Sequence, residues 1–295
     1  MKKISFFTSL FWLRLLVIFL IGVILALSWG CSSTFGTTPK RDKFLQPFLP
    51  TSIWNMPIGS DARYLKANIG KSPQASADEE YFFELKNKYP YRPVYAPGAW
   101  GEGRCTGTQY MDIAIPVPDD LIVPDATTQP NHTPNNASAF LMPDGRTLVQ
   151  LSPLARCEKS GSLYGWRYEN VDIYGEGIGG AHFGSGLSSI GGSIRKNELT
   201  NDEPIHHALK VIIWAKKYLF YDEKRPGYRW PANRADDYAA EQYGGANYAL
   251  VQGSLLAIPP EITKESLKLE TPAGKKLFDA LQDYGAYIVE DSHED

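Results

Sequence analysis

Short segments with alternating apolar residues are the feature that most restricts the fold of this chain. In the run from Met111 to Val117, the side chains of Ile113, Ile115 and Val117 would share one face of a strand. Similar runs occupy residues 147–151, 164–174 and 250–258. Strings rich in Gly, Pro, Asn and Asp, such as 131–136 and 143–146, separate these runs and are typical of turns. We therefore predict a mainly β fold, an antiparallel β-sandwich or jelly-roll-like single domain.

One clear helix is expected near the C-terminus, with few others. Thr271 can cap its start, Pro272 suits the first helical position, and Gly285 can end it in a left-handed turn. An apolar stripe at helical spacing lies between them, at Leu277, Phe278, Leu281 and Tyr284. Residues 286–289 are then expected to form a strand. The first half of 206–221 is also predicted as a strand, because its consecutive β-branched residues favour one.

The N-terminus has the layout of an export signal. Lys2, Lys3 and Arg14 precede an uncharged run of about 16 residues, which is shorter than the ~20 needed to cross a bilayer. Gly30 followed by Cys31 resembles the lipobox of bacterial lipoproteins, although Ser28 stands where that pattern has Leu. We expect residues 1–30 to be a lipoprotein-like signal peptide and Cys31 to carry lipid. An uncleaved membrane anchor is the alternative, and either places the rest of the chain in the cell envelope.

Residues 31–43 are rich in Ser, Thr and Gly and are expected to form a flexible tether. Residues 44–295 are expected to form one β-rich domain, long enough to bury a sizeable core. The chain has three cysteines, so lipidation of Cys31 leaves Cys105 and Cys157 as an even pair. We predict a disulfide between them, because exported proteins fold in oxidising compartments. Two unrelated buried thiols are the alternative.

The charge balance argues against a nucleic-acid partner. The chain has 30 basic and 33 acidic residues, and three of the basic ones lie in the predicted signal peptide. Phosphate backbones are bound through basic faces, and the sequence supplies none. A neutral substrate is compatible with this balance, whereas an anionic one would need a local cluster of Arg and Lys.

The segment most indicative of function is 175–192, which holds eight glycines in eighteen positions around His182 and Ser185. Such density favours a loop with positive φ angles or close backbone approach. It is not a phosphate-binding loop, because no Lys follows the last Gly. It is not a dinucleotide-binding turn, because a βαβ pattern is missing. Ser185 has a glycine on each side, which is the wrong spacing for a nucleophile elbow.

Two carbohydrate chemistries fit the polar residues in and around this segment. A hydrolase needs two carboxyl groups, for which Asp172, Glu176 and Glu198 are available. A lyase acting on uronic acids needs a base, an acid and a cation. His182 or His207 could be the base, Tyr174 the acid, and Arg195 or Arg234 the cation. The predicted catalytic residues are therefore His207, His182, Glu198, Asp172, Tyr174 and Arg195, and the predicted substrate-binding residues are Ser185, Trp230, Arg234 and Glu176.

No metal or cofactor is expected, because the possible ligands are sparse. His206 and His207 would point to opposite faces of a strand and could not chelate one ion. Structural roles are the alternative for each predicted residue: Asp172 could cap a turn, Glu198 could pair with Arg195 or Lys196 at the surface, and His207 could be a buried structural histidine.

Separated blocks of the chain resemble a set of uncharacterised secreted bacterial proteins. The similar blocks are Ser52 to Asn55, Gly184 to Gly186, Arg195 with Glu198, Ile205 to Leu209, Trp230 to Ala232, and Ala280 to Val289. The resemblance implies a shared fold and directs attention to His207 rather than His206, but it implies no reaction.

These observations favour an exported, envelope-tethered protein that acts on a polysaccharide or cell-envelope glycan by hydrolysis or β-elimination. A non-catalytic glycan- or envelope-binding lipoprotein is the main alternative. A structural envelope lipoprotein that contacts a partner protein is the third.

Overall fold

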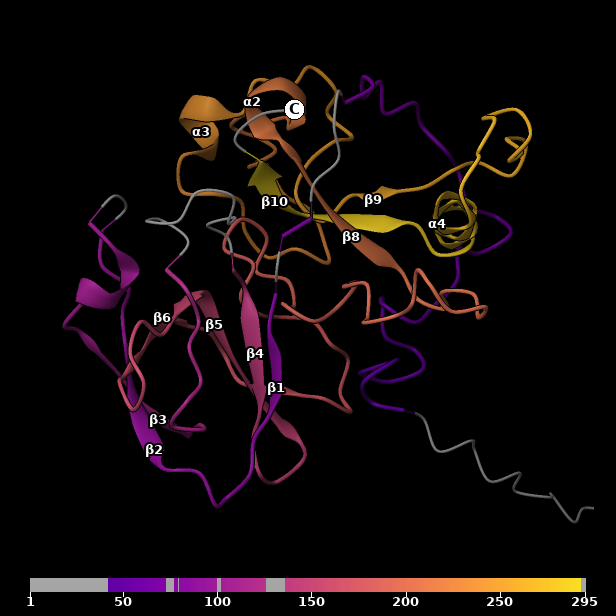
Figure 1. The fold of residues 1–295 in the computed structure, drawn as a ribbon. Helices are drawn as coiled ribbons and strands as arrows, with labels where there is room; N and C mark the ends of the chain where they lie inside the picture. Colours follow the sequence, from indigo (N-terminus) through magenta and orange to yellow (C-terminus); the bar gives the residue numbers. More distant parts are fainter. Residues whose placement is uncertain (1–41, 73–76, 79, 100–101, 126–135, 293–295) are drawn as a thin grey trace, which may run out of the picture. The chain divides into compact units, whose positions relative to one another are not determined.

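The computed structural model describes residues 42–72, 77–78, 80–99, 102–125 and 136–292 (Figure 1). The predicted signal peptide, the lipidation site at Cys31 and nearly all of the predicted tether lie outside these ranges. Within them, no helix is both long enough and apolar enough to cross a membrane.

The described residues form two sheets, and the larger has seven strands. Its order is β1 (Phe82–Glu84), β4 (Ser138–Leu141), β5 (Thr147–Ala155), β6 (Leu163–Arg167), β2 (Tyr91–Tyr95) and β3 (Tyr110–Pro116), and β7 (Val171–Asp172) also pairs with β5. The β1–β4 and β2–β6 pairs are parallel and the other pairs are antiparallel. The predicted strands at 111–117 and 147–151 are therefore present, and the predicted run 164–174 is divided between β6 and β7.

The smaller sheet has three strands, with β10 (Ala286–Ser292) between β8 (Leu209–Trp214) and β9 (Leu255–Leu256). β10 runs parallel to β8 and antiparallel to β9. The register with β8 shifts between Ile288 and Glu290, where β10 contains one additional residue. The strands expected in the first half of 206–221 and at 286–289 are confirmed, but the predicted run 250–258 contributes only the two residues of β9.

The long C-terminal helix forms as predicted, as α4 (Pro272–Asp283). Thr271 Oγ1 accepts a hydrogen bond from the Gly274 N–H at 3.0 Å, and Gly285 ends the helix with φ of 77°. The other helices in the described ranges have three or four residues: η1 (Arg104–Thr106), α2 (Ala215–Tyr218) and α3 (Ala239–Gln242).

One core cluster joins the two sheets around Trp54, whose side chain is buried. The Trp54 ring packs edge-on against Tyr287 of β10, with ring centroids 5.3 Å apart, and Leu141 of β4 and Leu148 of β5 belong to the same cluster. Trp54 Nε1 donates a hydrogen bond to the Gly177 carbonyl at 2.9 Å. A Cβ on Gly191 would lie 2.2 Å from the indole, so the glycine-rich segment can cross Trp54 only without a side chain there.

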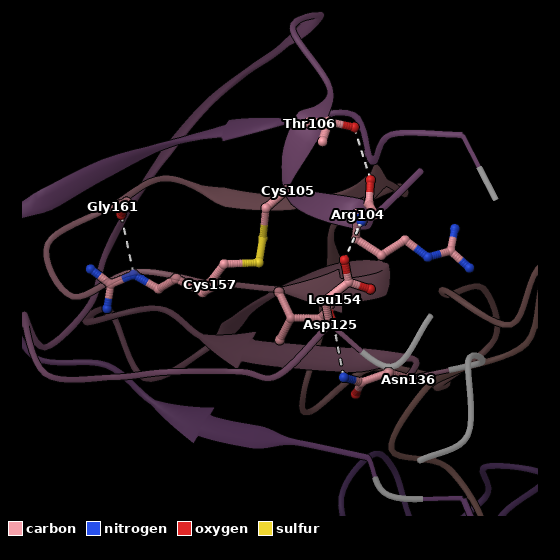
Figure 2. Close-up of a disulfide and its surroundings, with 10 residues drawn as sticks. Arg104, Cys105, Thr106, Asp125, Asn136, Leu154, Cys157 and Gly161 are labelled. Atoms are coloured by element: carbon pink, nitrogen blue, oxygen red, sulfur yellow. Dashed lines mark hydrogen bonds between the residues drawn. A yellow bond between two sulfur atoms is a disulfide. The ribbon is translucent and has the colours of Figure 1, made fainter. Parts of the chain in front are cut away.

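The expected β-rich class with few helices is confirmed, although the sheets are mixed because three strand pairs run parallel. The predicted disulfide is also confirmed. Cys105 in η1 is bonded to Cys157, which follows β5, with Cα atoms 6.3 Å apart (Figure 2).

Candidate functional site

A cavity of about 280 Å³ lies between residues of the two sheets, and we name it the inter-sheet cavity. β5 and β6 provide one side of it through Ser152, Pro153 and Trp166, and β10 provides Glu290 and Asp291. Tyr168, Phe183, Asp236, Tyr238 and Arg104 complete the lining. The cavity therefore combines aromatic walls, three carboxyl groups and one guanidinium group.

Two of these carboxyl groups, on Asp236 and Glu290, are buried and close to each other. A Cβ on Gly184 would lie 2.7 Å from Glu290 Oε1 and 2.9 Å from Asp236 Oδ2. The two oxygens therefore cannot be farther apart than the sum of those distances. The Gly184 N–H also donates a hydrogen bond to Glu290 Oε1 at 2.7 Å. The glycine-rich segment thus supports an acid pair at the cavity wall.

The environment of Asp236 favours its protonated form. Burial and the nearby negative charge of Glu290 raise the pKa of Asp236 to about 6. Hydrogen bonds donated by the Tyr243 hydroxyl at 2.5 Å and by Gln252 Nε2 at 3.4 Å act in the opposite direction but are the weaker effect. The Asp236 carboxyl can therefore hold a proton in weakly acidic solution.

The bulge in β10 precedes Glu290 directly. A regular strand alternates its side chains between two faces, and Tyr287 and Val289 share one core cluster while Ile288 belongs to another. The register shift between Ile288 and Glu290 breaks the regular pairing just before the acid. Bulges of this kind re-aim side chains and are common beside active sites.

Behind Glu290 lies a buried group that we name the His182 cluster: Glu80, His182, Lys210 and Glu290. His182 Nδ1 is 3.4 Å from Glu290 Oε2, and Nε2 is 3.3 Å from Glu80 Oε1. Lys210 Nζ lies 2.9 Å from His182 Nε2, forms an ion pair with Glu80 and donates to the Ser189 carbonyl at 2.6 Å. The imidazole is therefore held between two carboxylates, with one ammonium group beside it.

The charges in this cluster balance when His182 is an imidazolium ion. Burial opposes ionisation of Glu80, but Lys210 and His182 outweigh it and lower the pKa of Glu80 to about 2. Burial and Lys210 also oppose the charge on His182, but its hydrogen bonds with Glu290 and Glu80 outweigh them and raise the pKa of His182. Both shifts favour the charged forms, in which two positive groups face two carboxylates.

A second cavity, of about 330 Å³, lies against the cluster, and we name it the rear cavity. Its lining includes Glu80, His182, Lys210, Ser193 and Val289. Glu290 lines the inter-sheet cavity and Glu80 lines the rear cavity, so His182 contacts one carboxylate from each.

Two arginines border the aromatic side of the inter-sheet cavity. Arg104 is buried, and its backbone N–H donates to Asp125 Oδ2 at 2.5 Å next to the disulfide (Figure 2). The guanidinium carbon of Arg234 lies 5.1 Å from the ring centroid of Tyr168 and 5.7 Å from that of Phe183. The guanidinium of Arg234 thus contacts two rings that line the cavity.

Of the sequence-predicted residues, His182 contacts Glu290 and Arg234 contacts two aromatic rings of the inter-sheet cavity. Glu198 and His207 instead pair with each other, with His207 Nε2 3.1 Å from Glu198 Oε1. Glu198 Oε2 also accepts the Arg195 N–H at 2.5 Å, and the Glu198 carbonyl accepts from Lys276 of α4 at 2.6 Å. These contacts tie the turn at 195–198 to the start of β8 and to α4.

The other predicted residues do not line the inter-sheet cavity. Asp172 forms an ion pair with Arg146, and Tyr174 and Glu176 are exposed. The Ser185 hydroxyl is buried and accepts the Leu187 N–H at 3.1 Å, so it stabilises a turn. Arg195 Nε donates to the Phe44 carbonyl at 2.9 Å. Trp230 is 69% exposed and does not line the inter-sheet cavity.

Sequence reasoning did not single out Asp236, Glu290, Glu80 or Lys210. A signal for Glu290 was present, because two carboxyl residues, Glu290 and Asp291, follow the apolar run of a predicted strand. Burying a charged group costs free energy unless it is compensated, so an acid continuing a buried strand indicates a partner or a site.

No group of three or more His, Cys, Asp and Glu side chains suited to hold a metal ion occurs among the residues that the structure describes. Comparisons of the chain with protein-family models, with curated proteins and with solved structures give no match, so its function is argued from the site alone.

Proposed function

We propose that this protein is an exported, envelope-tethered glycan-active enzyme that hydrolyses a glycosidic bond in the inter-sheet cavity. The observation that carries the proposal is the acid pair of Asp236 and Glu290 in an aromatic-walled cavity. Glycosidases use two carboxyl groups with separated pKa values, one protonated and the other ionised. Export and tethering rest on the basic N-terminus, its apolar run and Cys31.

In the proposed reaction, Asp236 is the acid and Glu290 the nucleophile. The Asp236 proton passes to the glycosidic oxygen while that oxygen's bond to the anomeric carbon breaks and a Glu290 oxygen bonds to the same carbon. A water molecule then gives a proton to Asp236, and the oxygen of that water bonds to the anomeric carbon while the bond from the carbon to Glu290 breaks. This retaining course matches the close approach of the oxygens, because inverting enzymes hold their carboxyl groups roughly 6.5–9.5 Å apart.

The walls of the cavity suit a sugar ring. Trp166 is 42% exposed, and Tyr168 and Phe183 line the same space. Aromatic faces present apolar surface to the C–H face of a sugar while polar groups bind its hydroxyls. Burial raises the pKa of Tyr168 to about 12, so its hydroxyl remains a hydrogen-bond donor at neutral pH.

Hydrolysis fits the site better than β-elimination from a uronic acid. A lyase must offset the substrate carboxylate with positive charge. The lining of the inter-sheet cavity instead carries three carboxyl groups, on Asp236, Glu290 and Asp291. They outnumber the two guanidinium groups nearby, that of Arg104 in the lining and that of Arg234 against the rings of Tyr168 and Phe183. His182, one of the two predicted lyase bases, has Nδ1 facing Glu290 and Nε2 facing Glu80, so neither ring nitrogen points to a substrate proton in the inter-sheet cavity.

The test is a screen of the full-length protein against neutral and uronic-acid polysaccharides, following reducing ends and the absorbance of unsaturated sugar ends. We expect reducing ends without new absorbance. Asp236→Asn and Glu290→Gln should each lower the rate by about 100-fold or more, as loss of an acid–base group does. Asp237→Asn, an exposed neighbour, is the matched control.

Other outcomes would assign other functions. New absorbance from unsaturated ends would establish a lyase and refute hydrolysis. Glycan binding with no bond cleavage, unaffected by Asp236→Asn and Glu290→Gln, would establish a non-catalytic glycan-binding protein.

A further inference from the structure

We propose that Glu80 is a positioning residue that keeps His182 charged, so that His182 clamps and orients Glu290 for the reaction. This inference rests on the proposed function for its catalytic consequence. The clamp itself consists of contacts that can be tested without any substrate.

Glu290 is held at both of its oxygens. Oε1 accepts the Gly184 N–H at 2.7 Å, and Oε2 faces His182 Nδ1 at 3.4 Å. A nucleophilic carboxylate needs such restraint, because small displacements from the attack geometry cost large factors in rate. His182 is buried, so its own orientation depends on what lies at its other nitrogen.

Glu80 provides that second contact. Its Oε1 lies 3.3 Å from His182 Nε2, and its Oε2 accepts the Ser193 hydroxyl at 2.9 Å and pairs with Lys210. Glu80 precedes β1 at the edge of the large sheet, whereas Lys210 and Glu290 belong to β8 and β10 of the small sheet. The clamp therefore links the edge of one sheet to the acid on the other.

The charge on His182 depends on Glu80. The groups facing the imidazole are Glu80 from the segment before β1, Lys210 from β8 and Glu290 from β10, with Asp236 beyond Glu290. Without the Glu80 charge, burial and the Lys210 ammonium 2.9 Å from Nε2 would both oppose an imidazolium, so the pKa of His182 would fall and its neutral form would be favoured. The acid pair would then lose a neighbouring positive charge and bind its proton more tightly.

The first test is ¹⁵N NMR of the histidine side chains in the full-length protein across pH, with His182→Gln to assign the His182 signals. In the native protein we expect both nitrogens of His182 to stay protonated to a higher pH than those of an ordinary histidine. In Glu80→Gln the His182 transition should move down by one pH unit or more. Glu80→Asp keeps the negative charge, so its His182 transition should lie close to that of the native protein. Glu84 is an exposed neighbour paired with Lys86, so Glu84→Gln should leave the His182 transition unchanged.

The second test uses the pH dependence of kcat and KM. Glu80→Gln should lower kcat by about 10-fold with little change in KM. Both the acidic and the basic limb of the plot of kcat against pH should move to higher pH. Identical His182 titrations in the native protein and Glu80→Gln would overturn the clamp, whether or not the protein hydrolyses glycans. A shifted titration in a protein without hydrolase activity would refute the proposed function and leave the clamp standing.

Discussion

Asp236 Oδ2 and Glu290 Oε1 approach the same point beside the α-carbon of Gly184, 2.9 Å and 2.7 Å from where a Cβ would lie. Asp236 comes from the loop before α3 and Glu290 from the central strand of the small sheet. A residue with a side chain at position 184 would occupy the space through which the two acids approach each other. The absence of a side chain at position 184 is thus part of the site.

Gly184→Ala should therefore damage the site more than the fold. The added methyl group must displace Glu290, Asp236 or Gln252, all within 2.9 Å, so we expect at least a 10-fold loss of glycan hydrolysis and about 1–3 kcal/mol of lost stability. Enzyme assays and urea unfolding measure the two effects. Gly59→Ala is the control, since only the exposed Asp61 side chain lies near its Cβ. Equal activity of Gly184→Ala and Gly59→Ala would show that the pair tolerates displacement.

The proposed acid predicts how activity depends on pH. Asp236 has a pKa of about 6 and must be protonated to donate to the leaving group. The value of kcat/KM should therefore fall as the pH rises through about 6. Measuring kcat/KM against pH on the best substrate checks this fall. A rate that rises between pH 6 and 8 would exclude Asp236 as the acid.

The same group predicts how stability depends on pH. The pKa of Asp236 is raised from 3.8 in the unfolded chain to about 6 in the fold, so the folded state binds more protons between these values and its stability falls as the pH rises through them. Asp236→Asn removes this effect. We expect the variant to be about 1–2 kcal/mol more stable than the native protein at pH 7 and to lose that advantage near pH 4. Chemical unfolding at both pH values is the measurement, and a constant difference would contradict the linkage.

The pair of Glu198 and His207 should act on stability. Both side chains are buried and bond to each other, and Glu198 is tied to the Arg195 backbone. Glu198→Gln or His207→Ala should cost about 1–3 kcal/mol, the penalty for leaving a buried polar partner unsatisfied. Thermal unfolding measures a structural role of the pair, and kcat of the folded fraction measures a catalytic one. A large loss of kcat in a fully folded variant would instead return this pair to the catalytic role that the sequence predicts.

The disulfide should support both the fold and the cavity. It joins residues 52 positions apart, so replacing both Cys105 and Cys157 by Ser should cost about 2–4 kcal/mol. Arg104 adjoins Cys105 and lines the inter-sheet cavity, so glycan affinity should also fall. Unfolding and binding measurements on the double variant check both effects. An unfolding free energy equal to that of the native protein would contradict a stabilising role.

Local signals in the sequence predicted the elements that depend on local physics. The alternation at 111–117 predicted β3, and Thr271, Pro272 and Gly285 predicted both ends of α4. The parity of the cysteines predicted the disulfide. Parallel pairing of β8 with β10 left no such signal, because a long connection with little regular structure separates the two strands.

The site was predictable only in part. Glycine density drew attention to His182, which the structure places at the centre of a buried cluster. The partnership of Asp236 with Glu290 depends on the packing of the two sheets and on a bulge in β10, neither of which leaves a pattern in one sequence. Asp172 and Glu198 have the right chemistry, but they are engaged by Arg146 and His207.

The position of β10 in the middle of the small sheet has a consequence for how the protein matures. Every strand of the large sheet in the described residues ends by residue 172, so that sheet precedes the central strand of the small sheet in the chain. The small sheet cannot close until residues 286–292 arrive, and Glu290 arrives with them. The acid pair therefore depends on the last strand of the chain, and a chain that terminates before residue 286 would lack both the nucleophile and the β10 side chains of the core that joins the two sheets.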